Sequence, residues 1–207
     1  MNEGYREVLS SIGSSEPTPG GGSVAALSLA HAHSLAMMVA RLTVGKEKWK
    51  EGHEAAQFVI SKSQVGVEEA IRLAEIDAES FDSVMAAYRL PRESEDQKEA
   101  RKAVIREATI GAAEAPLSTA SSASELLSSL EIMCTSCNSN ALTDLASASE
   151  LALSAVNMAA MNVRINLDFI KGKDVERLAS QIDGVVHKSN TSADTIRLIV
   201  NERLGWL

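Results

Sequence analysis

Residues 17–23 read Pro-Thr-Pro-Gly-Gly-Gly-Ser and open directly into an apolar segment, Val24–Leu42. Two prolines stiffen the approach, and three glycines let bare backbone N–H groups come close to a ligand. We expect Ser23 to be the N-cap of a helix, so that free amides and the positive end of the helix dipole face the glycines. The stretch predicts a site for an anion or a carbonyl group at a helix start; a flexible glycine-rich linker is the alternative.

Several classes of ligand do not fit this chain. It has no GxxxxGK[S/T] pattern and no strand expected before the glycines, so neither a nucleoside triphosphate nor a dinucleotide site is expected. A formal net charge of −8 argues against nucleic-acid binding, which needs a basic face. A local basic cluster follows the apolar segment, and an anionic ligand would need such a cluster: Arg41, Lys46, Lys48 and Lys50.

The periodicity of apolar residues predicts an all-α fold. The chain has 207 residues, enough for one domain over residues 1–207, and at 3% aromatic residues its core must consist of small aliphatic side chains. No segment shows sustained alternation of apolar and polar residues, whereas long segments repeat every 3.5 to 3.6 residues. We expect long antiparallel helices in an up-and-down bundle.

The N-terminal segment carries no signal peptide, because Met1–Ile12 is polar and reads as an amphipathic helix. Residues 24–44 approach the length of a membrane span, but histidine, serine and arginine side chains interrupt them at a high cost in lipid. We therefore expect a cytoplasmic protein without a membrane partner.

The helix that we expect from about Lys50 to just before Pro91 has the clearest pattern. Its apolar residues follow alternating steps of four and three, as in a coiled coil: Val67, Ile71, Ala74, Ala78, Phe81, Met85 and Tyr88. At 1.5 Å per residue it is roughly 60 Å long, which is long for a domain of this size. The pattern predicts a homodimer that is formed through helices.

Three more helices complete the prediction. Ser94 and Gln97 have the spacing of a capping box and begin the next helix, which Pro116 should kink or restart and which ends near Cys137–Asn140. Another helix runs from about Leu142 to Ile170, and the last one ends at Gly205.

Four polar residues stand on or beside apolar helix faces. Asn162 and Asn166 share one side of their helix, either as a helix–helix hydrogen-bond network or as part of a polar pocket. Asp77 borders the long apolar seam, where it is either a rim charge or a buried group able to move a proton. Asp144 lies in the first turn of its helix, where stabilisation of the dipole alone could explain it.

The remaining candidates for metal chemistry are weak. Cys134 and Cys137 form a lone CxxC without a second pair, so we expect reduced thiols and no zinc site. His31 and His33 point to different sides of their helix and are expected to be packed histidines. The sequence predicts no metal ligands.

Taken together, these motifs resemble the cyclodeaminase/cyclohydrolase family, which includes the C-terminal half of formiminotransferase-cyclodeaminase. The resemblance covers nearly the whole chain. Its motifs are residues 17–27, 38–46, Asp77 with Ser80-Phe81, residues 85–91, Asn138-Ser139-Asn140 through Asp144, and residues 162–167. Arg41, Cys137 and Thr143 depart from the residues usual in the family.

The resemblance implies an all-helical homodimer that binds a tetrahydrofolate derivative, with or without additional glutamates, and that needs no metal or redox cofactor. It implies formiminotetrahydrofolate cyclodeaminase or methenyltetrahydrofolate cyclohydrolase activity at the N5/N10 bridge. The substrate-binding residues would be Thr18, Gly20, Gly21, Gly22, Ser23, Lys46, Asn138, Asn140, Asn162 and Asn166.

Both reactions pass through a tetrahedral carbon, so both need a base, an acid and a negative group near the cationic bridge. Asp77 and Asp144 are the candidates for these roles, Asn162 and Asn166 would orient the pterin, and Lys46 would meet the glutamate carboxylates. The alternative from another class is a helical dimer that binds folate or a protein partner without catalysis.

Overall fold

The computed structural model describes residues 3–206, and this part of the chain contains helices and no strand. The all-α prediction is confirmed. The elements are α1 (Glu3–Ile12), α2 (Gly21–Val44), the short 3₁₀ helix η1 (Glu47–Gly52), α3 (His53–Tyr88), α4 (Glu95–Met133), the 3₁₀ helix η2 (Ser139–Ala141), α5 (Leu142–Leu167) and α6 (Lys173–Leu204).

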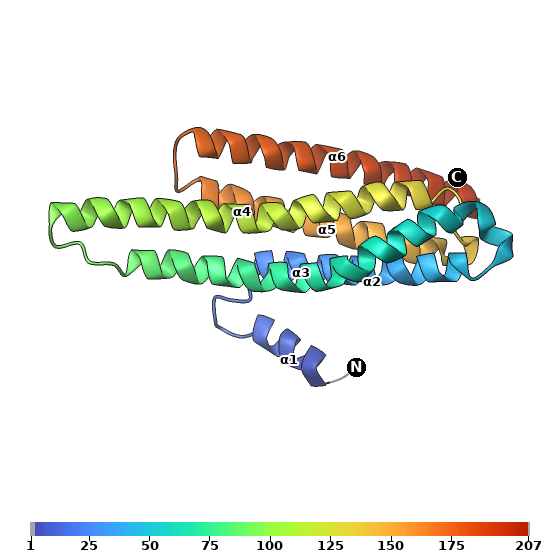
Figure 1. The fold of residues 1–207 in the computed structure, drawn as a ribbon, viewed down its shortest axis with the longest axis horizontal. Helices are drawn as coiled ribbons and strands as arrows, with labels where there is room; N and C mark the ends of the chain where they lie inside the picture. Colours follow the sequence, from blue (N-terminus) through green and yellow to red (C-terminus); the bar gives the residue numbers. More distant parts are fainter. Residues whose placement is uncertain (1–2, 207) are drawn as a thin grey trace.

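Successive long helices run in opposite directions along one elongated bundle (Figure 1). Helix α2 packs against α3 and α5, α4 packs against the same two helices, and α6 lies against α4 and α5. Helix α1 lies beside the bundle in Figure 1, and none of its residues is buried. The N-terminal end of α2 lies about midway along the bundle, whereas its C-terminal end lies with η1 and η2 at one end.

Small side chains allow α2 to occupy the middle of the bundle. Ala25, Ala32, Ala36 and Ala40 are fully buried on it, and no Phe, Tyr or Trp of residues 3–206 is buried anywhere. Helices that present alanine can approach one another closely. Within residues 3–206, α2 is the one helix long and apolar enough to cross a membrane, but 56% of its most apolar window is buried by the rest of the bundle.

The start of α2 differs from the sequence prediction. The helix begins at Gly21, and its N-cap residue is Gly20, which supplies no side-chain hydrogen bond. The prediction that Ser23 is the N-cap is therefore wrong, because Ser23 is already the third residue of the helix and its hydroxyl bonds to another helix.

Helix α4 also differs from its prediction. It begins with the expected capping box of Ser94 and Gln97, but it continues from Glu95 to Met133 through Pro116, so the predicted restart is wrong. Proline has no N–H to donate to the carbonyl four residues earlier, which is that of Ala112. That carbonyl instead accepts a hydrogen bond from Asn166 Nδ2 of α5 at 2.9 Å. A side chain from α5 thus replaces the backbone bond that Pro116 removes.

His33 is the buried titratable group of α2. Its ring lies against Gly66 of α3, where a Cβ would collide with the imidazole, and its Nδ1 is hydrogen-bonded to Ser63 Oγ at 3.1 Å. Burial lowers the pKa of His33 to about 4, so the imidazole is neutral at pH 7.

We predict a pH-dependent stability from this histidine. Its pKa is lower in the folded chain than in the unfolded chain, so the unfolded state binds the extra proton between pH 6.5 and pH 4, and stability falls as the pH falls through this window. The His33→Gln variant should lack this loss, which amounts to at most about 3 kcal/mol. Urea unfolding of both proteins at pH 7 and pH 4 measures the difference. Equal losses in the two proteins would show that His33 does not titrate as described.

Candidate active site

The side chain of Asp77 in α3 meets the first turn of α2. Ser23 Oγ donates a hydrogen bond to Asp77 Oδ2 at 3.0 Å, and the Ser23 backbone N–H also donates to this carboxylate. The carboxylate also lies directly against Gly22, where any Cβ would collide with it. Asp77 therefore fills the role that a capping side chain usually has, from a different helix.

This position changes the chemistry of Asp77. Burial raises the pKa of its carboxyl group, while the two hydrogen bonds from Ser23 act in the opposite direction; the net shift is upward. A carboxylate with a raised pKa is better matched to proton transfer near neutral pH than an exposed one.

Asn162 and Asn166 of α5 lie across from this turn with their amide groups held by backbone carbonyls. Asn162 Nδ2 donates to the carbonyl of Met158 at 2.9 Å, and Asn166 Nδ2 donates to those of Ala112 and Asn162, both at 2.9 Å. Because carbonyls only accept, these bonds fix which end of each amide carries the nitrogen. No residue of 3–206 donates to either Oδ1 atom, so each asparagine keeps a hydrogen-bond acceptor available.

A cavity of about 430 Å³ brings these groups together. Its polar lining comes from the Thr18–Gly22 region, Asp77 and the two asparagines, and Thr109 and Ala112 of α4 also contribute. Its apolar lining consists of Pro17, Phe81, Val84, Tyr88 and Phe169. The arrangement suits a flat, partly apolar ligand that donates several hydrogen bonds and has a reacting atom near a carboxylate.

The predicted binding residues thus fall into two groups. Thr18, Gly20, Gly21, Gly22, Asp77, Asn162 and Asn166 all line the cavity, and Ser23 lies buried behind them against Asp77. The α2 terminus was expected to receive an anion or a carbonyl group. The Asp77 carboxylate already accepts from Ser23 in its first turn, which disfavours an anion there, and the glycines still line the cavity.

Four other predicted residues, Lys46, Asn138, Asn140 and Asp144, do not line this cavity. The Asn138 backbone N–H donates to Thr43 Oγ1 and its Nδ2 to the carbonyl of Leu42, so Asn138 lies at the C-terminal end of α2. At 1.5 Å per residue, that end is about 33 Å from Gly21 along the helix.

Within one chain these four residues therefore lie apart from the cavity, and their predicted role in binding stays a prediction. Asn138 holds the turn before α5, with its Oδ1 accepting from the Asn140 N–H, and the backbone of Lys46 bonds to Thr43 at the end of α2. Asp144 is in the first turn of α5, about 27 Å along that helix from Asn162. Asp77 and Asp144 of one chain cannot act on the same atom.

Sequence reasoning missed the aromatic lining of the cavity. Phe81 and Tyr88 were read only as members of an apolar seam, yet both line the cavity. The signal was available, because Phe81 follows Asp77 by four residues and Tyr88 follows it by eleven, which brings all three to one side of α3.

The two cysteines lie outside this site. Both are buried free thiols, and burial raises the pKa of Cys134 to about 12, so a thiolate is strongly disfavoured. Within residues 3–206, no group of three or more His, Cys, Asp or Glu side chains is arranged to hold a metal ion.

Comparison with known proteins gives a consistent result. A family profile described as Formiminotransferase-cyclodeaminase matches residues 4–183. Methenyltetrahydrofolate cyclohydrolase of Methylorubrum extorquens is 32% identical over 208 residues, which cover 99% of both chains. Formimidoyltransferase-cyclodeaminase of Gallus gallus is 28% identical over 171 residues, and this match covers 32% of that longer protein.

The fold has a solved counterpart as well. The crystal structure of formiminotetrahydrofolate cyclodeaminase from Thermotoga maritima superposes with a TM-score of 0.80, covering 97% of this chain and 94% of that one, at 24% sequence identity. At this identity the likeness establishes the bundle architecture.

We predict that two adjacent glycines respond differently to alanine. A Cβ at Gly22 collides with the Asp77 carboxylate, whereas at Gly21 the nearest neighbouring atom, Asn162 Nδ2, is 3.4 Å away. Gly22→Ala should destabilise the chain by about 1–3 kcal/mol through overpacking, and Gly21→Ala should be neutral or slightly stabilising because alanine favours helix. Chemical denaturation measures both variants. Equal stability of the two would rule out the close contact between Gly22 and Asp77.

Proposed function

The chain belongs to the formiminotransferase-cyclodeaminase family, and from this premise we propose that the Asp77 cavity is its catalytic site. The protein is a folate enzyme of one-carbon metabolism, a formiminotetrahydrofolate cyclodeaminase or a methenyltetrahydrofolate cyclohydrolase. Of these two, we propose cyclohydrolase activity, because the relative that is 32% identical over 99% of both chains has that name, whereas the cyclodeaminase structure is 24% identical. The observation that carries the site assignment is the convergence of Asp77 with two acceptor amides in one cavity.

The shape and polarity of the cavity fit a reduced pterin. A tetrahydropterin ring donates through its ring N–H and amino groups, and the free Oδ1 atoms of Asn162 and Asn166 are acceptors held in place by their own Nδ2 bonds. Phe81 and Tyr88 supply flat apolar surface for the aromatic ring beyond the bridge.

Asp77 has the properties that the reaction needs. The methenyl bridge is cationic, and a desolvated carboxylate beside it stabilises that charge. In the hydrolysis, water adds to the bridge carbon and its proton goes to Asp77. The bond from this carbon to N5 then breaks, and Asp77 returns its proton to N5. The hydroxyl proton on the carbon goes to solvent as the formyl C=O forms, so the formyl group stays on N10 and the loss of this proton balances the positive charge of the substrate. In the cyclodeaminase reaction, N10 attacks the formimino carbon and loses its proton. The formimino nitrogen takes up this proton and departs as ammonia.

Neither reaction changes the oxidation state of the bridge carbon, so we propose that no redox cofactor takes part. We also propose that Asp77 alone supplies the proton transfer without a metal, and assays in the presence of EDTA test this part. A cytoplasmic location remains a proposal, and so does the absence of a nucleic-acid partner, which rests on the net charge of −8.

Asp77→Asn should lower the turnover number by about 10²–10⁴-fold, the usual contribution of one general acid–base group. The asparagine can still accept from Ser23, so folding should be retained. Asp144→Asn is the matched control and should leave turnover nearly unchanged, because Asp144 lies at the end of the bundle. The absorbance of methenyltetrahydrofolate and ammonia release from formiminotetrahydrofolate measure the two activities in parallel. Full activity of Asp77→Asn in both assays would exclude Asp77 as the catalytic group.

A different basic residue replaces Lys46 as the candidate for the glutamate end of the substrate. Arg101 of α4 lies over the ring of Tyr88, with its guanidinium carbon 5.5 Å from the ring centroid, and its Nη2 donates to the Tyr88 carbonyl at 2.9 Å. No carboxylate of residues 3–206 pairs with Arg101. Tyr88 lines the cavity about 16 Å along α3 from Asp77, and Arg101, which is not itself a lining residue, lies against Tyr88 at this end.

Arg101→Met should therefore raise the KM for a glutamate-bearing substrate about tenfold, as expected for the loss of one charge-assisted hydrogen bond, and leave kcat largely unchanged. Lys46→Met is the control and should change neither parameter. Steady-state kinetics with both variants measure the effect. A rise in KM for Lys46→Met alone would reverse the assignment.

We propose that the enzyme is a homodimer in which α3 packs against a second copy. The predicted seam is uncovered in the single chain: Ile71 is 42% exposed and Met85 is 39% exposed. Phe81 and Tyr88 belong to the same seam and also line the cavity, so a partner on this face would close the cavity from outside.

Light scattering should give a mass twice the 22.0 kDa of one chain, and Ile71→Glu, which lies outside the cavity lining, should shift it toward the monomer. A monomeric wild-type protein at micromolar concentration would contradict the proposed dimer.

A further inference from the structure

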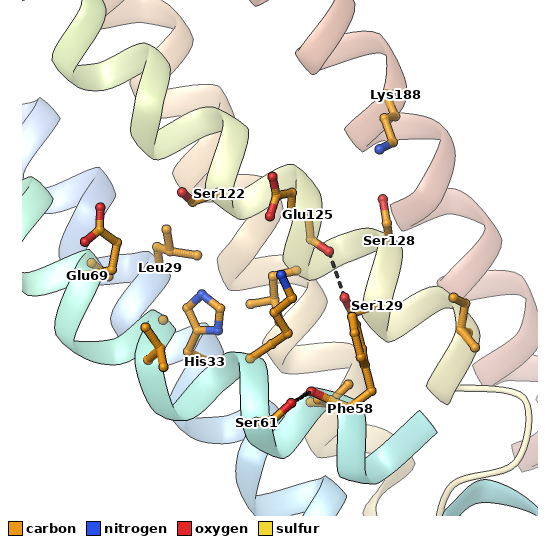
Figure 2. A pocket seen from close by; sticks show the side chains of 17 residues that line it. Leu29, His33, Phe58, Ser61, Glu69, Ser122, Glu125, Ser128, Ser129 and Lys188 are labelled. Carbon is orange, nitrogen blue, oxygen red and sulfur yellow. Dashed lines mark hydrogen bonds between the residues drawn. The ribbon is translucent and has the colours of Figure 1, made fainter. Parts of the chain in front are cut away.

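A second and larger cavity lies between α3 and α4, over the buried face of α2 (Figure 2). Its volume is about 610 Å³, against about 430 Å³ for the Asp77 cavity, and the two share no lining residue. Its wall combines polar side chains with apolar ones, among the latter Leu29, Val59, Val65, Leu126 and Ile132. The volume and the apolar lining are those of a small-molecule site.

His33 is the polar group at the floor of this cavity. The residue is only 7% exposed, and Figure 2 shows its ring directed into the space between α3 and α4. Ser63 bonds to Nδ1, and no residue of 3–206 bonds to Nε2. Nε2 keeps contact with the open space of the cavity, so it is the ring position to which a group in the cavity can bond.

A glycine on α3, Gly66, leaves space for the His33 ring, although glycine lowers the stability of a helix. Gly66 is in the interior of the long helix α3, where glycine is about 0.5–1 kcal/mol less favourable than alanine. A Cβ at this position would collide with the His33 ring. Glycine at position 66 therefore keeps a neutral imidazole beside the cavity.

Three of the four serines in the wall do not offer donors to a ligand. The hydroxyls of Ser61, Ser128 and Ser129 donate to the backbone carbonyls of Phe58, Ser124 and Glu125. Figure 2 shows two of these bonds, and they leave only acceptor positions on the three oxygens. The free imidazole nitrogen and the hydroxyl of Ser122, the fourth serine, are thus the points at which a ligand group can be oriented.

The charged groups at the edge favour an anion. Lys62 of α3 and Lys188 of α6 line the cavity, and neither pairs with a carboxylate of residues 3–206. Of the two carboxylates there, Glu69 is already bonded to Arg72, which leaves Glu125. Within residues 3–206, the edge thus carries two ammonium groups without a carboxylate partner, of which Lys62 lies 5.8 Å from the centroid of the Phe58 ring, and one carboxylate without a basic partner.

From these observations we propose that the cavity between α3 and α4 is a second small-molecule site, separate from the folate site. Its ligand has an apolar body, a hydrogen-bonding group that reaches His33 Nε2, and an anionic group held between Lys62 and Lys188. This site does not depend on the catalytic assignment of Asp77.

The fluorescent probe 8-anilinonaphthalene-1-sulfonate has the required apolar rings, one N–H and one anionic group. Titration into the native wild-type protein should give saturable fluorescence with one probe per chain. Ser122→Phe, which fills the cavity wall, should weaken binding at least tenfold. Lys62→Glu should weaken it several-fold, whereas the matched variant Lys102→Glu on the exposed side of α4 should not.

Three results would overturn the proposal. Unchanged probe affinity in both Ser122→Phe and Lys62→Glu would put the probe elsewhere, and competition by tetrahydrofolate would put it in the Asp77 cavity. The third result is a wild-type protein that is dimeric and binds no probe, together with a Val65→Glu variant that is monomeric. This result would assign the cavity to contact with a second copy. Near-UV circular dichroism of each variant checks that its native packing is intact, so that the probe reports a native cavity.

Discussion

The contact between the Asp77 carboxylate and the first turn of α2 is the interaction on which the site depends. Ser23 donates from both its hydroxyl and its backbone N–H, and Gly22 lets the carboxylate lie directly against the helix. The same contact joins α3 to the start of α2 and keeps a carboxylate away from solvent. The packing of α3 against α2 therefore has two effects: it holds the two helices together, and it desolvates Asp77 and so raises the pKa of its carboxyl group.

Pro116 has a comparable double effect on the opposite wall. Its missing N–H frees the carbonyl of Ala112, and Asn166 satisfies that carbonyl with its Nδ2. Because Nδ2 bonds to this carbonyl, Asn166 Oδ1 is left without a partner among residues 3–206 and remains available to a ligand. The proline at position 116 of α4 thus orients the amide of Asn166, a proposed binding residue on α5.

Helix periodicity predicts most of this architecture from the sequence, since the capping box at Ser94 and the seam of α3 need only local spacing. The shared side of Asn162 and Asn166 follows in the same way. Partners across helices were not predictable locally: Ser23 looks like an N-cap until Asp77 is seen against it. The separation of Lys46 from the glycines within one chain was predictable, because the 1.5 Å rise per residue puts the two ends of α2 about 33 Å apart.

The most direct test of the account is a crystal structure with a tetrahydrofolate that carries a formyl group on N5, which lacks the closed bridge. We predict the pterin between Gly21 and the two asparagines, with the formyl carbon beside Asp77 and with N10–H donating a hydrogen bond of about 3 Å to the Asp77 carboxylate. Ligand density in the His33 cavity, or at the bundle end near Asn138 and Asp144, with the Asp77 cavity empty, would contradict the central claim.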